Sequence, residues 1–205
     1  MYAKMLQFVV NYLENSNDAA ASIRHFPFRK RSEHSKRVFM WAQRLSDIES
    51  YFNKEAVLVS SIFHDVGYAI SVDSSKHAAN SAVVCEKYLA ENGFDGEIIN
   101  LVVSLVKNHS NKELMTVKGT PLELILLMEA DLLDETGALS IVWDCMMEGS
   151  QQIQTFEKTY THISNYTDKS LNGNPMVTTK AKAFWESKQN LVHEFIEQLS
   201  FDLDI

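Results

Sequence analysis

The sequence predicts an all-α protein that folds as one bundle of about eight to ten helices. Apolar residues recur at the three- and four-residue spacing of amphipathic helices along most of the 205-residue chain, and no segment alternates like a strand. Only 7 Gly and 3 Pro leave little material for the many tight turns of an all-β protein. A hydrophobic content of 45% is sufficient for a full core, and no repeat or linker divides the chain.

Composition also limits the partners. The formal charge of −8 argues against a general affinity for nucleic acids, although it leaves room for a local basic pocket that binds a small phosphate ligand. Cys85 and Cys145 fit neither a disulfide framework nor a cysteine-based zinc site, which favours a reducing compartment. The N-terminal segment lacks the features of a signal peptide, and no run approaches the ~18–20 apolar residues of a membrane span. We therefore expect a cytoplasmic protein without membrane contact.

The first part of the chain contains two expected helices joined by a basic connection. Apolar residues at helical spacing predict the first helix over residues 5–13. Pro27 and the run Arg29-Lys30-Arg31 mark the connection, which is either a solvated loop or a lip that attracts phosphate. Ser32 is the expected N-cap of the second helix. His34 lies on the apolar stripe of that helix, where a lone histidine would usually be a core residue with a backbone partner.

The third expected helix places two polar residues at its end. Asn53 opens it, and Gly67 is the expected stop. His64 and Asp65 would then occupy its last turn. Because adjacent helical residues point about 100° apart, both can reach one ion only if the ion lies near the helix end.

Two further helices carry a histidine at one end each. A cap within residues 73–75 begins the fourth helix, which has His77 in its first turn and ends at Gly93. Asp95 caps the fifth helix, and His109 lies at its C-terminal end. The helix dipole would favour an imidazolium there, which is a structural alternative to a catalytic role.

The remainder of the chain is also predicted to be helical. Thr120-Pro121-Leu122-Glu123 is typical of a capping box with Pro at the first helical position. The following helix is apolar on nearly all sides up to Asp131 and should lie in the core. Gly137 permits a turn into a helix that ends near Gly149. Two more helices are expected over residues 153–163 and 184–199, with a turn at residues 171–175 between them.

Histidine and aspartate side chains recur at positions that otherwise resemble core. His64 and Asp65 end an apolar run, where two polar side chains are costly to bury without partners. Imidazole and carboxylate groups suit Mg, Mn, Fe, Ni or Zn. The pair alone is a weak signal, but His34 upstream and Asp131 downstream supply further ligand-type residues. The sequence therefore predicts a metal site between helices, with two more histidines near its cavity, His77 and His109.

Several separated segments resemble the HD superfamily of metal-dependent phosphohydrolases, above all its small stand-alone bacterial members. Glu33-His34-Ser35-Lys36-Arg37-Val38 is similar to the first histidine helix of that family, and Ser60 to Gly67 to its signature. The resemblance runs from about residue 30 to the end of the chain. Leu132 stands where such relatives often carry Arg. The other similar segments are residues 129–138, 168–171 and 176–181.

The resemblance implies a single HD-type domain over residues 1–205, with a motif core of about 30–140 and C-terminal helices of about 150–200 packing on it. It also implies metal-dependent hydrolysis of a phosphoester or phosphoanhydride, with a nucleotide as the favoured substrate. The alternative is a sensor or regulatory domain that binds metal and nucleotide without turnover. A purely structural helical protein is disfavoured by the retained ligands. The expected partner is a small phosphorylated substrate, and a homodimer is compatible with this function.

The same resemblance assigns roles to particular residues. One divalent cation, which is Mn, Mg, Fe, Ni or Zn, would be held by His34, His64, Asp65 and Asp131. The candidate catalytic residues are His77, His109, Asp65 and Asp134. His77 and His109 either face the substrate, which we favour, or bind a second ion. Candidate phosphate contacts, each of which could equally be an exposed cation, are Arg37, Lys107 and Lys169.

Overall fold

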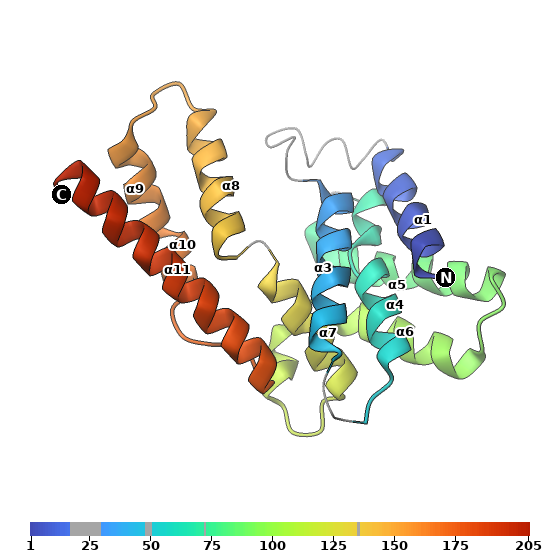
Figure 1. Cartoon of the computed structure of the whole chain (residues 1–205). Coiled ribbons are helices and arrows are strands. Elements are labelled where there is room, and N and C mark those ends of the chain that lie inside the picture. The colour runs from blue at the N-terminus through green and yellow to red at the C-terminus, as the bar shows by residue number, and fades with distance from the viewer. Residues whose placement is uncertain (17–29, 48–50, 72, 135) are drawn as a thin grey trace. The chain divides into compact units, whose positions relative to one another are not determined.

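The computed structural model describes residues 1–16, 30–47, 51–71, 73–134 and 136–205. In these ranges the chain forms α-helices and short 3-10 helices without a strand, which confirms the predicted all-α fold (Figure 1). None of the described helices is long and apolar enough to cross a membrane. The chain divides into two compact units, Met1–Asp131 and Leu132–Ile205. That the two form one domain stays a prediction.

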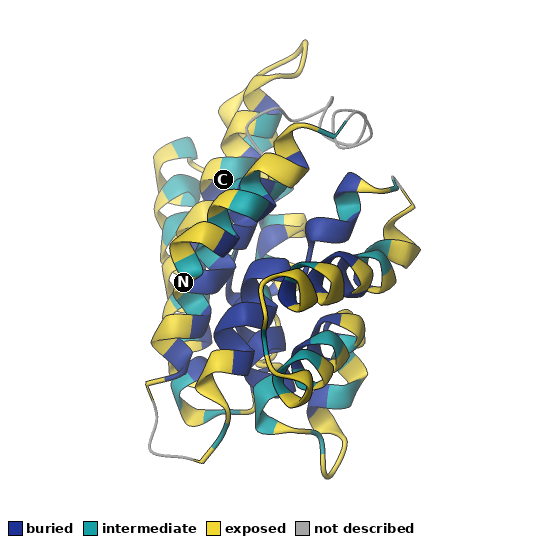
Figure 2. Ribbon diagram, turned by 90° about the vertical axis from the view of Figure 1, so that its right-hand side faces the viewer, coloured by how far each residue is buried: buried dark blue, intermediate teal, exposed yellow. Residues whose placement is uncertain are grey.

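The first unit is built around α4 (Lys54–Phe63), which packs on α1, α3, α5 and α6. All residues of α4 from Ala56 to Phe63 are buried, and so are those of α7 from Leu124 to Ala130. The apolar sequence of α7 had predicted this burial, and Figure 2 shows how buried residues collect on the inner sides of the helices. The other helices of this unit are α1 (Tyr2–Glu14), α3 (Arg31–Leu45), α5 (His77–Glu91), α6 (Gly96–Asn108) and α7 (Leu122–Leu133), with short 3-10 helices η1 (Val66–Ala69), η2 (Ser74–Lys76) and η3 (Lys112–Thr116).

Several predicted helix starts are confirmed by side-chain caps. Asn53 accepts a hydrogen bond from the N–H of Ala56 at the start of α4. Asp95 accepts one from the N–H of Glu97 at the start of α6. These caps satisfy N–H groups that have no partner within the first helical turn.

Two predicted caps are wrong, although α7 does begin at Leu122 within the predicted segment. α3 begins at Arg31 with Lys30 at the N-cap, and the hydroxyl of Ser32 donates to Glu14 of α1 at 2.9 Å instead of capping the helix. At Thr120 the reciprocal bond of a capping box is missing, because the Thr120 N–H donates to the Val117 carbonyl. The Glu123 carboxylate accepts a bond from the N–H of Asn53, so it ties α7 to the start of α4.

Gly67 is not the helix stop that the sequence suggested, since α4 ends at Phe63 and the glycine lies inside η1. A Cβ atom at this position would lie 2.2 Å from the His77 carbonyl oxygen and 2.4 Å from the Ser81 nitrogen. The Gly67 N–H donates to the Ser81 hydroxyl at 2.8 Å. Glycine is therefore required, because η1 contacts the backbone of α5 at His77 and Ser81.

The second unit contains α8 (Ala138–Gly149), α9 (Phe156–Asn165), α10 (Thr167–Ser170) and α11 (Thr179–Leu203). The turn predicted at residues 171–175 is present, and Trp185 of α11 donates to the Gly173 carbonyl at 2.9 Å. Ile153 was expected within a helix but precedes α9, because Thr155 caps that helix. Gly137 adopts φ +69° at the start of α8, as the predicted turn requires.

The close contact at Gly67 gives a first prediction. Gly67→Ala should destabilise the protein by about 1–3 kcal/mol or more, because the added methyl group meets backbone atoms that cannot rotate away. Gly96→Ala is the matched control, since a Cβ atom there meets nothing within 4 Å. Chemical denaturation of both variants measures the effect. A Gly67→Ala protein as stable as Gly96→Ala would contradict this account of the η1–α5 contact.

Candidate metal centre

Three of the predicted histidines each end a helix and bond to the backbone three residues earlier. His64, His77 and His109 are the C-cap residues of α4, η2 and α6. Their Nδ1 atoms lie 2.8, 2.5 and 2.7 Å from the carbonyl oxygens at the third preceding positions. A carbonyl oxygen can only accept, so each Nδ1 carries a proton, and in the neutral ring the lone pair is on Nε2. This is the tautomer in which a histidine binds a metal through Nε2.

The first group of candidate ligands consists of the four predicted residues His34, His64, Asp65 and Asp131. The Nε2 atoms of His34 and His64 lie 3.1 Å apart. His34 Nε2 lies 3.5 Å from Asp65 Oδ2 and 3.3 Å from Asp131 Oδ1. His64 Nε2 lies 3.7 Å from each of the same two oxygens. The structure thus brings together all four residues that the sequence had selected.

These separations suit a single ion. Four ligands at the ~2.0–2.2 Å bond lengths of zinc would be separated by about 3.3–3.6 Å in a tetrahedron, and by about 3 Å when adjacent in an octahedron. The five separations found in the first group run from 3.1 to 3.7 Å. Nitrogen and carboxylate oxygen donors suit Mn, Fe, Ni or Zn, whereas calcium prefers oxygen alone.

The second group lies on the other oxygen of Asp65. Asp65 Oδ1 is 3.5 Å from His77 Nε2 and 3.5 Å from His109 Nε2, and these two nitrogens are 3.2 Å apart. Asp65 therefore lies between two pairs of histidines, with one carboxylate oxygen directed at each pair. His77 and His109 lie beside the first group, as the sequence predicted, and their separation also suits a shared ion.

Burial and charge determine the protonation of this site. Burial is the main reason that the pKa of His64 falls to about 4, so its imidazole is neutral near pH 7. Burial alone would raise the pKa of Asp65, but His64, His109, His34 and Arg31 outweigh it and hold that pKa below its usual value. For Asp131 burial is likewise outweighed, chiefly by Lys112 and then by His34, and its pKa lies well below the usual range. Both carboxylates are ionised and the lone pair of His64 Nε2 is available to a cation.

Two cations that the sequence did not select contact the carboxylates. Arg31 Nη1 donates to Asp65 Oδ2 at 3.0 Å, and its guanidinium lies 4.3 Å from the centre of the Tyr68 ring. Tyr68 in turn stacks on His77 with ring centres 4.6 Å apart. Lys112 Nζ lies 2.6 Å from Asp131 Oδ2. Arg31 belongs to the basic run that we had interpreted as a loop or a lip that attracts phosphate, and Lys112 follows His109 by three residues. Their closeness in sequence to His34 and His109 is the only sequence signal that could have indicated these two cations.

The predicted phosphate contacts come from α3, from α6 and from the second unit. Arg37 is half-buried in α3, and Lys107 is exposed at the end of α6. Lys169 belongs to the second unit, where it is exposed and donates to Asn165 at 2.9 Å. Asp134 is buried just after α7. The roles of these four residues stay predictions, and Arg29 of the basic run lies outside the described residues.

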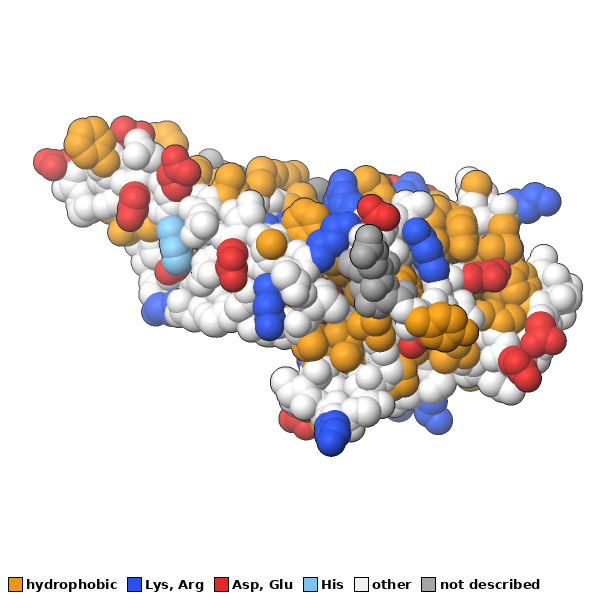
Figure 3. Space-filling model, turned by 60° about the horizontal axis from the view of Figure 1, so that its bottom comes forward, with side chains coloured by type: hydrophobic (Ala, Val, Ile, Leu, Met, Phe, Trp, Pro, Cys, Tyr) orange, Lys and Arg blue, Asp and Glu red, His pale blue; other side chains and the backbone are white. Residues whose placement is uncertain are grey.

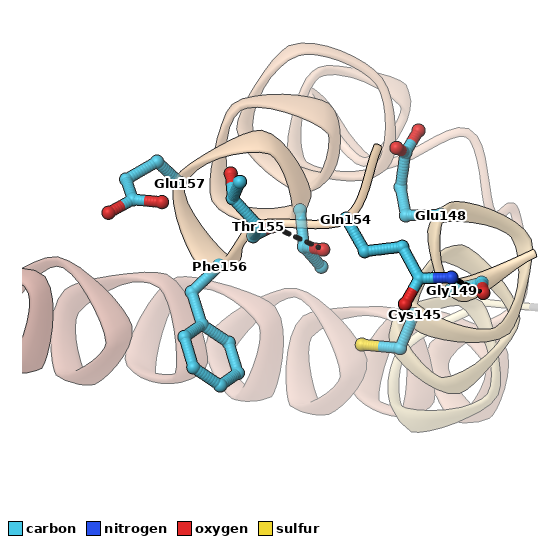
Figure 4. Close-up of a pocket in the computed structure, with 8 residues that line it drawn as sticks. Cys145, Glu148, Gly149, Gln154, Thr155, Phe156 and Glu157 are labelled. Atoms are coloured by element: carbon cyan, nitrogen blue, oxygen red, sulfur yellow. Dashed lines mark hydrogen bonds between the residues drawn. The ribbon is translucent and has the colours of Figure 1, made fainter. Parts of the chain in front are cut away.

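Two cavities elsewhere contain none of the candidate ligands. One of about 570 Å³ in the first unit is lined by residues of α1, α4, α5, α6 and the α5–α6 turn, including Lys4, Glu55 and Tyr88. Another of about 480 Å³ lies in the second unit between α8 and the start of α9 (Figure 4). Its lining includes Cys145, Glu148 and Phe156, which offer no cluster of metal-ligand type.

Comparison with known proteins identifies the family and the fold of the chain. Residues 31–136, just over half of the chain, match the HD domain family. Comparison with curated proteins finds no match. An HD-superfamily hydrolase from Bacillus thuringiensis superimposes with a TM-score of 0.72 at 20% identity, over 99% of this chain and 96% of that one. A predicted HD-superfamily hydrolase from an uncultured Thermotogales bacterium gives 0.67 at 18% identity, over 98% and 92%. YpgQ of Bacillus subtilis in complex with ADP gives 0.64 at 18% identity, over 98% and 96%.

The chain belongs to the HD domain family. The matched segment contains every residue of the two ligand groups, from His34 to Asp131. The solved structures are too distant in sequence to add more than the fold, which is the helical HD fold predicted from the motifs. Family membership supports the general class of metal-dependent phosphohydrolases, and the residues present fit a divalent ion.

The low pKa of His64 gives a second prediction, for protein freed of metal by chelation. Well above pH 6.5 the imidazole of His64 is neutral in the folded and in the unfolded protein, so it does not lower the free energy of unfolding. As the pH falls from 6.5 toward 4, the unfolded chain takes up a proton that the folded protein does not. The free energy of unfolding should therefore fall, by up to about 3 kcal/mol from this group. Chemical denaturation at several pH values should show a smaller loss for His64→Gln, and equal pH slopes would contradict the assignment.

Proposed function

We propose that this protein is a metal-dependent phosphohydrolase that cleaves a phosphoester or phosphoanhydride bond of a nucleotide. The observation that supports it most is the convergence of imidazole nitrogens and carboxylate oxygens on both sides of Asp65, at the separations of metal ligands. These side chains come from five helices, α3, α5, α7 and the C-terminal ends of α4 and α6, which favours a fixed site over a chance cluster.

The ligand atoms are buried on one side and accessible on the other. His64 and His109 are almost fully buried, whereas the side chains of Asp131, Arg31 and Lys112 are 21%, 31% and 31% exposed. A substrate would approach from this exposed side. A divalent ion bound there would lower the pKa of a water molecule and polarise the phosphoryl group. Arg31 presents a guanidinium next to that position, and its planar donors suit phosphate oxygens.

The number of ions depends on His77 and His109. We favour one ion in the first group, with these two histidines directed at the substrate. The alternative is a second ion held by His77, His109 and Asp65 Oδ1, since their mutual separations of 3.2–3.5 Å also suit it. Under the first arrangement the Nε2 atoms of His77 and His109 would accept or donate protons at the phosphate.

A nucleotide substrate is supported by two observations. YpgQ, which shares the fold, binds ADP in its crystal structure. The chain has a net charge of −8, and on the face drawn in Figure 3 acidic side chains lie among the basic ones. A small anionic ligand drawn into a local positive site agrees better with this surface than a nucleic acid does.

The proposal predicts turnover by the Mn²⁺-loaded protein. A panel of nucleoside mono-, di- and triphosphates and simple phosphoesters should include at least one substrate, read by release of phosphate or pyrophosphate. Asp65→Ala should lose both bound metal and turnover, because Asp65 faces all four histidines. A wild-type protein that binds metal and nucleotide but releases nothing would instead be a sensor.

His77 and His109 separate the two metal arrangements. If they face the substrate, His77→Ala and His109→Ala should keep one bound ion and lose ~10²–10³-fold in rate, as when a group that stabilises the transition state is removed. If they bind a second ion, metal content per chain should fall along with the rate. Elemental analysis, melting temperature and turnover on both variants distinguish these outcomes. Normal turnover in both would contradict either arrangement.

A further inference from the structure

We propose that Lys112 exchanges partners when the site is loaded: it neutralises Asp131 in the metal-free protein and binds a substrate phosphate oxygen once a cation has taken over Asp131. The inference deepens the proposed function and rests on it. It concerns a residue outside the two ligand groups and outside every segment that marked the family in the sequence.

The two oxygens of Asp131 have different neighbours. Oδ1 faces the imidazoles, at 3.3 Å from His34 Nε2 and 3.7 Å from His64 Nε2. Oδ2 is 2.6 Å from the ammonium group of Lys112. The lysine therefore occupies the oxygen that is turned away from the ligand atoms. It lies one carboxylate group away from the position of an ion.

Charge balance explains why Lys112 pairs with Asp131 in the metal-free protein and why a bound cation would weaken that pair. Two ion pairs set the carboxylates of Asp65 and Asp131 against two cations, Arg31 and Lys112. An added divalent ion would bring an excess of two positive charges into a partly buried space. The repulsion between that ion and the ammonium group weakens the pairing of Lys112 with Asp131. A phosphate dianion then supplies negative charge to both the divalent ion and the ammonium group of Lys112.

The geometry of Lys112 allows such a movement, whereas that of Arg31 opposes it. Lys112 lies on the short helix η3, and its side chain is 31% exposed. Its ammonium is a point charge with three donors on a flexible four-carbon stem. Arg31 is instead fixed between Asp65 and the face of Tyr68, which itself stacks on His77. Of the two cations, Lys112 is thus the one suited to exchange.

This exchange predicts opposite effects of one substitution on two ligands. In Lys112→Met the metal no longer competes with an ammonium group, so Mn²⁺ should bind on the order of 10-fold more tightly. Binding of inorganic phosphate to the Mn²⁺-loaded protein should weaken by about 10- to 100-fold, the usual cost of losing a charge-assisted hydrogen bond. Electron paramagnetic resonance of free Mn²⁺ and calorimetry with phosphate measure the two affinities without any need for turnover.

Matched variants make the result specific. Lys118→Met removes the same charge from an exposed position six residues further on and should change neither affinity. Lys112→Arg keeps the charge and should restore most of the phosphate affinity. Lys112→Gln, which can still bond to Asp131, serves as the neutral variant if Lys112→Met does not fold.

The possible results separate this inference from the proposed function. Weaker binding of both ligands in Lys112→Met would show a structural role and overturn the exchange, and so would two unchanged affinities. A wild-type protein that does not bind Mn²⁺ would overturn the metal site and the exchange together. Wild-type protein that binds Mn²⁺ and phosphate but hydrolyses no substrate would remove the enzymatic function, while the two affinities would still decide the role of Lys112.

Discussion

The hydrogen bond from an imidazole Nδ1 to the carbonyl three residues earlier is the interaction on which the candidate site depends. It recurs at His64, His77 and His109, each at the C-cap of a helix or 3-10 helix. The last carbonyls of a helix have no partner within the helix, so a side-chain donor there stabilises the helix end. The same bond fixes the tautomer and directs Nε2 outward. A local requirement of helix termination thereby prepares three metal-ligand nitrogens without any metal.

The second constraint is the charge of two carboxylates, the buried Asp65 and the half-buried Asp131. Asp65 is almost fully buried beside four imidazoles, and an ionised carboxylate in that position is costly without compensating charge. Arg31 and Lys112 supply that compensation in the described part of the chain, which explains how the protein can hold the site together before a cation binds. The close packing at Gly67 then brings η1 and α5 together, so Asp65 and His77 are held at a fixed separation.

The sequence predicted the helices and the residues that converge on Asp65 better than it predicted the helix caps and the ion-pair partners. Helical periodicity is visible within a short segment, and the motif residues follow one another in a fixed order along the chain. Together these two signals selected all six members of the two ligand groups. Ser32, Gly67 and Glu123 were misassigned because their roles depend on other helices: Ser32 bonds to Glu14, Gly67 approaches Ser81, and Glu123 bonds to Asn53. Each has a sequence signature that also fits a local role, and only tertiary contacts decide between them. Arg31 and Lys112 were missed for the same reason, since an exposed-looking cation shows no periodicity that reveals an ion pair 19 or 34 residues away.

The position of Asp65 links the chemistry to the fold. A carboxylate whose two oxygens face different pairs of histidines cannot turn toward one pair without leaving the other. The two histidine pairs are therefore coupled through one side chain, whether the second pair serves a phosphate or an ion. Asp65 follows directly after the buried end of α4, the helix that packs on four others, so its position is set by the core of the unit. Packing that stabilises this core also fixes the distance between the two halves of the site, because the buried helix α4 sets the positions of His64 and Asp65 directly after its end.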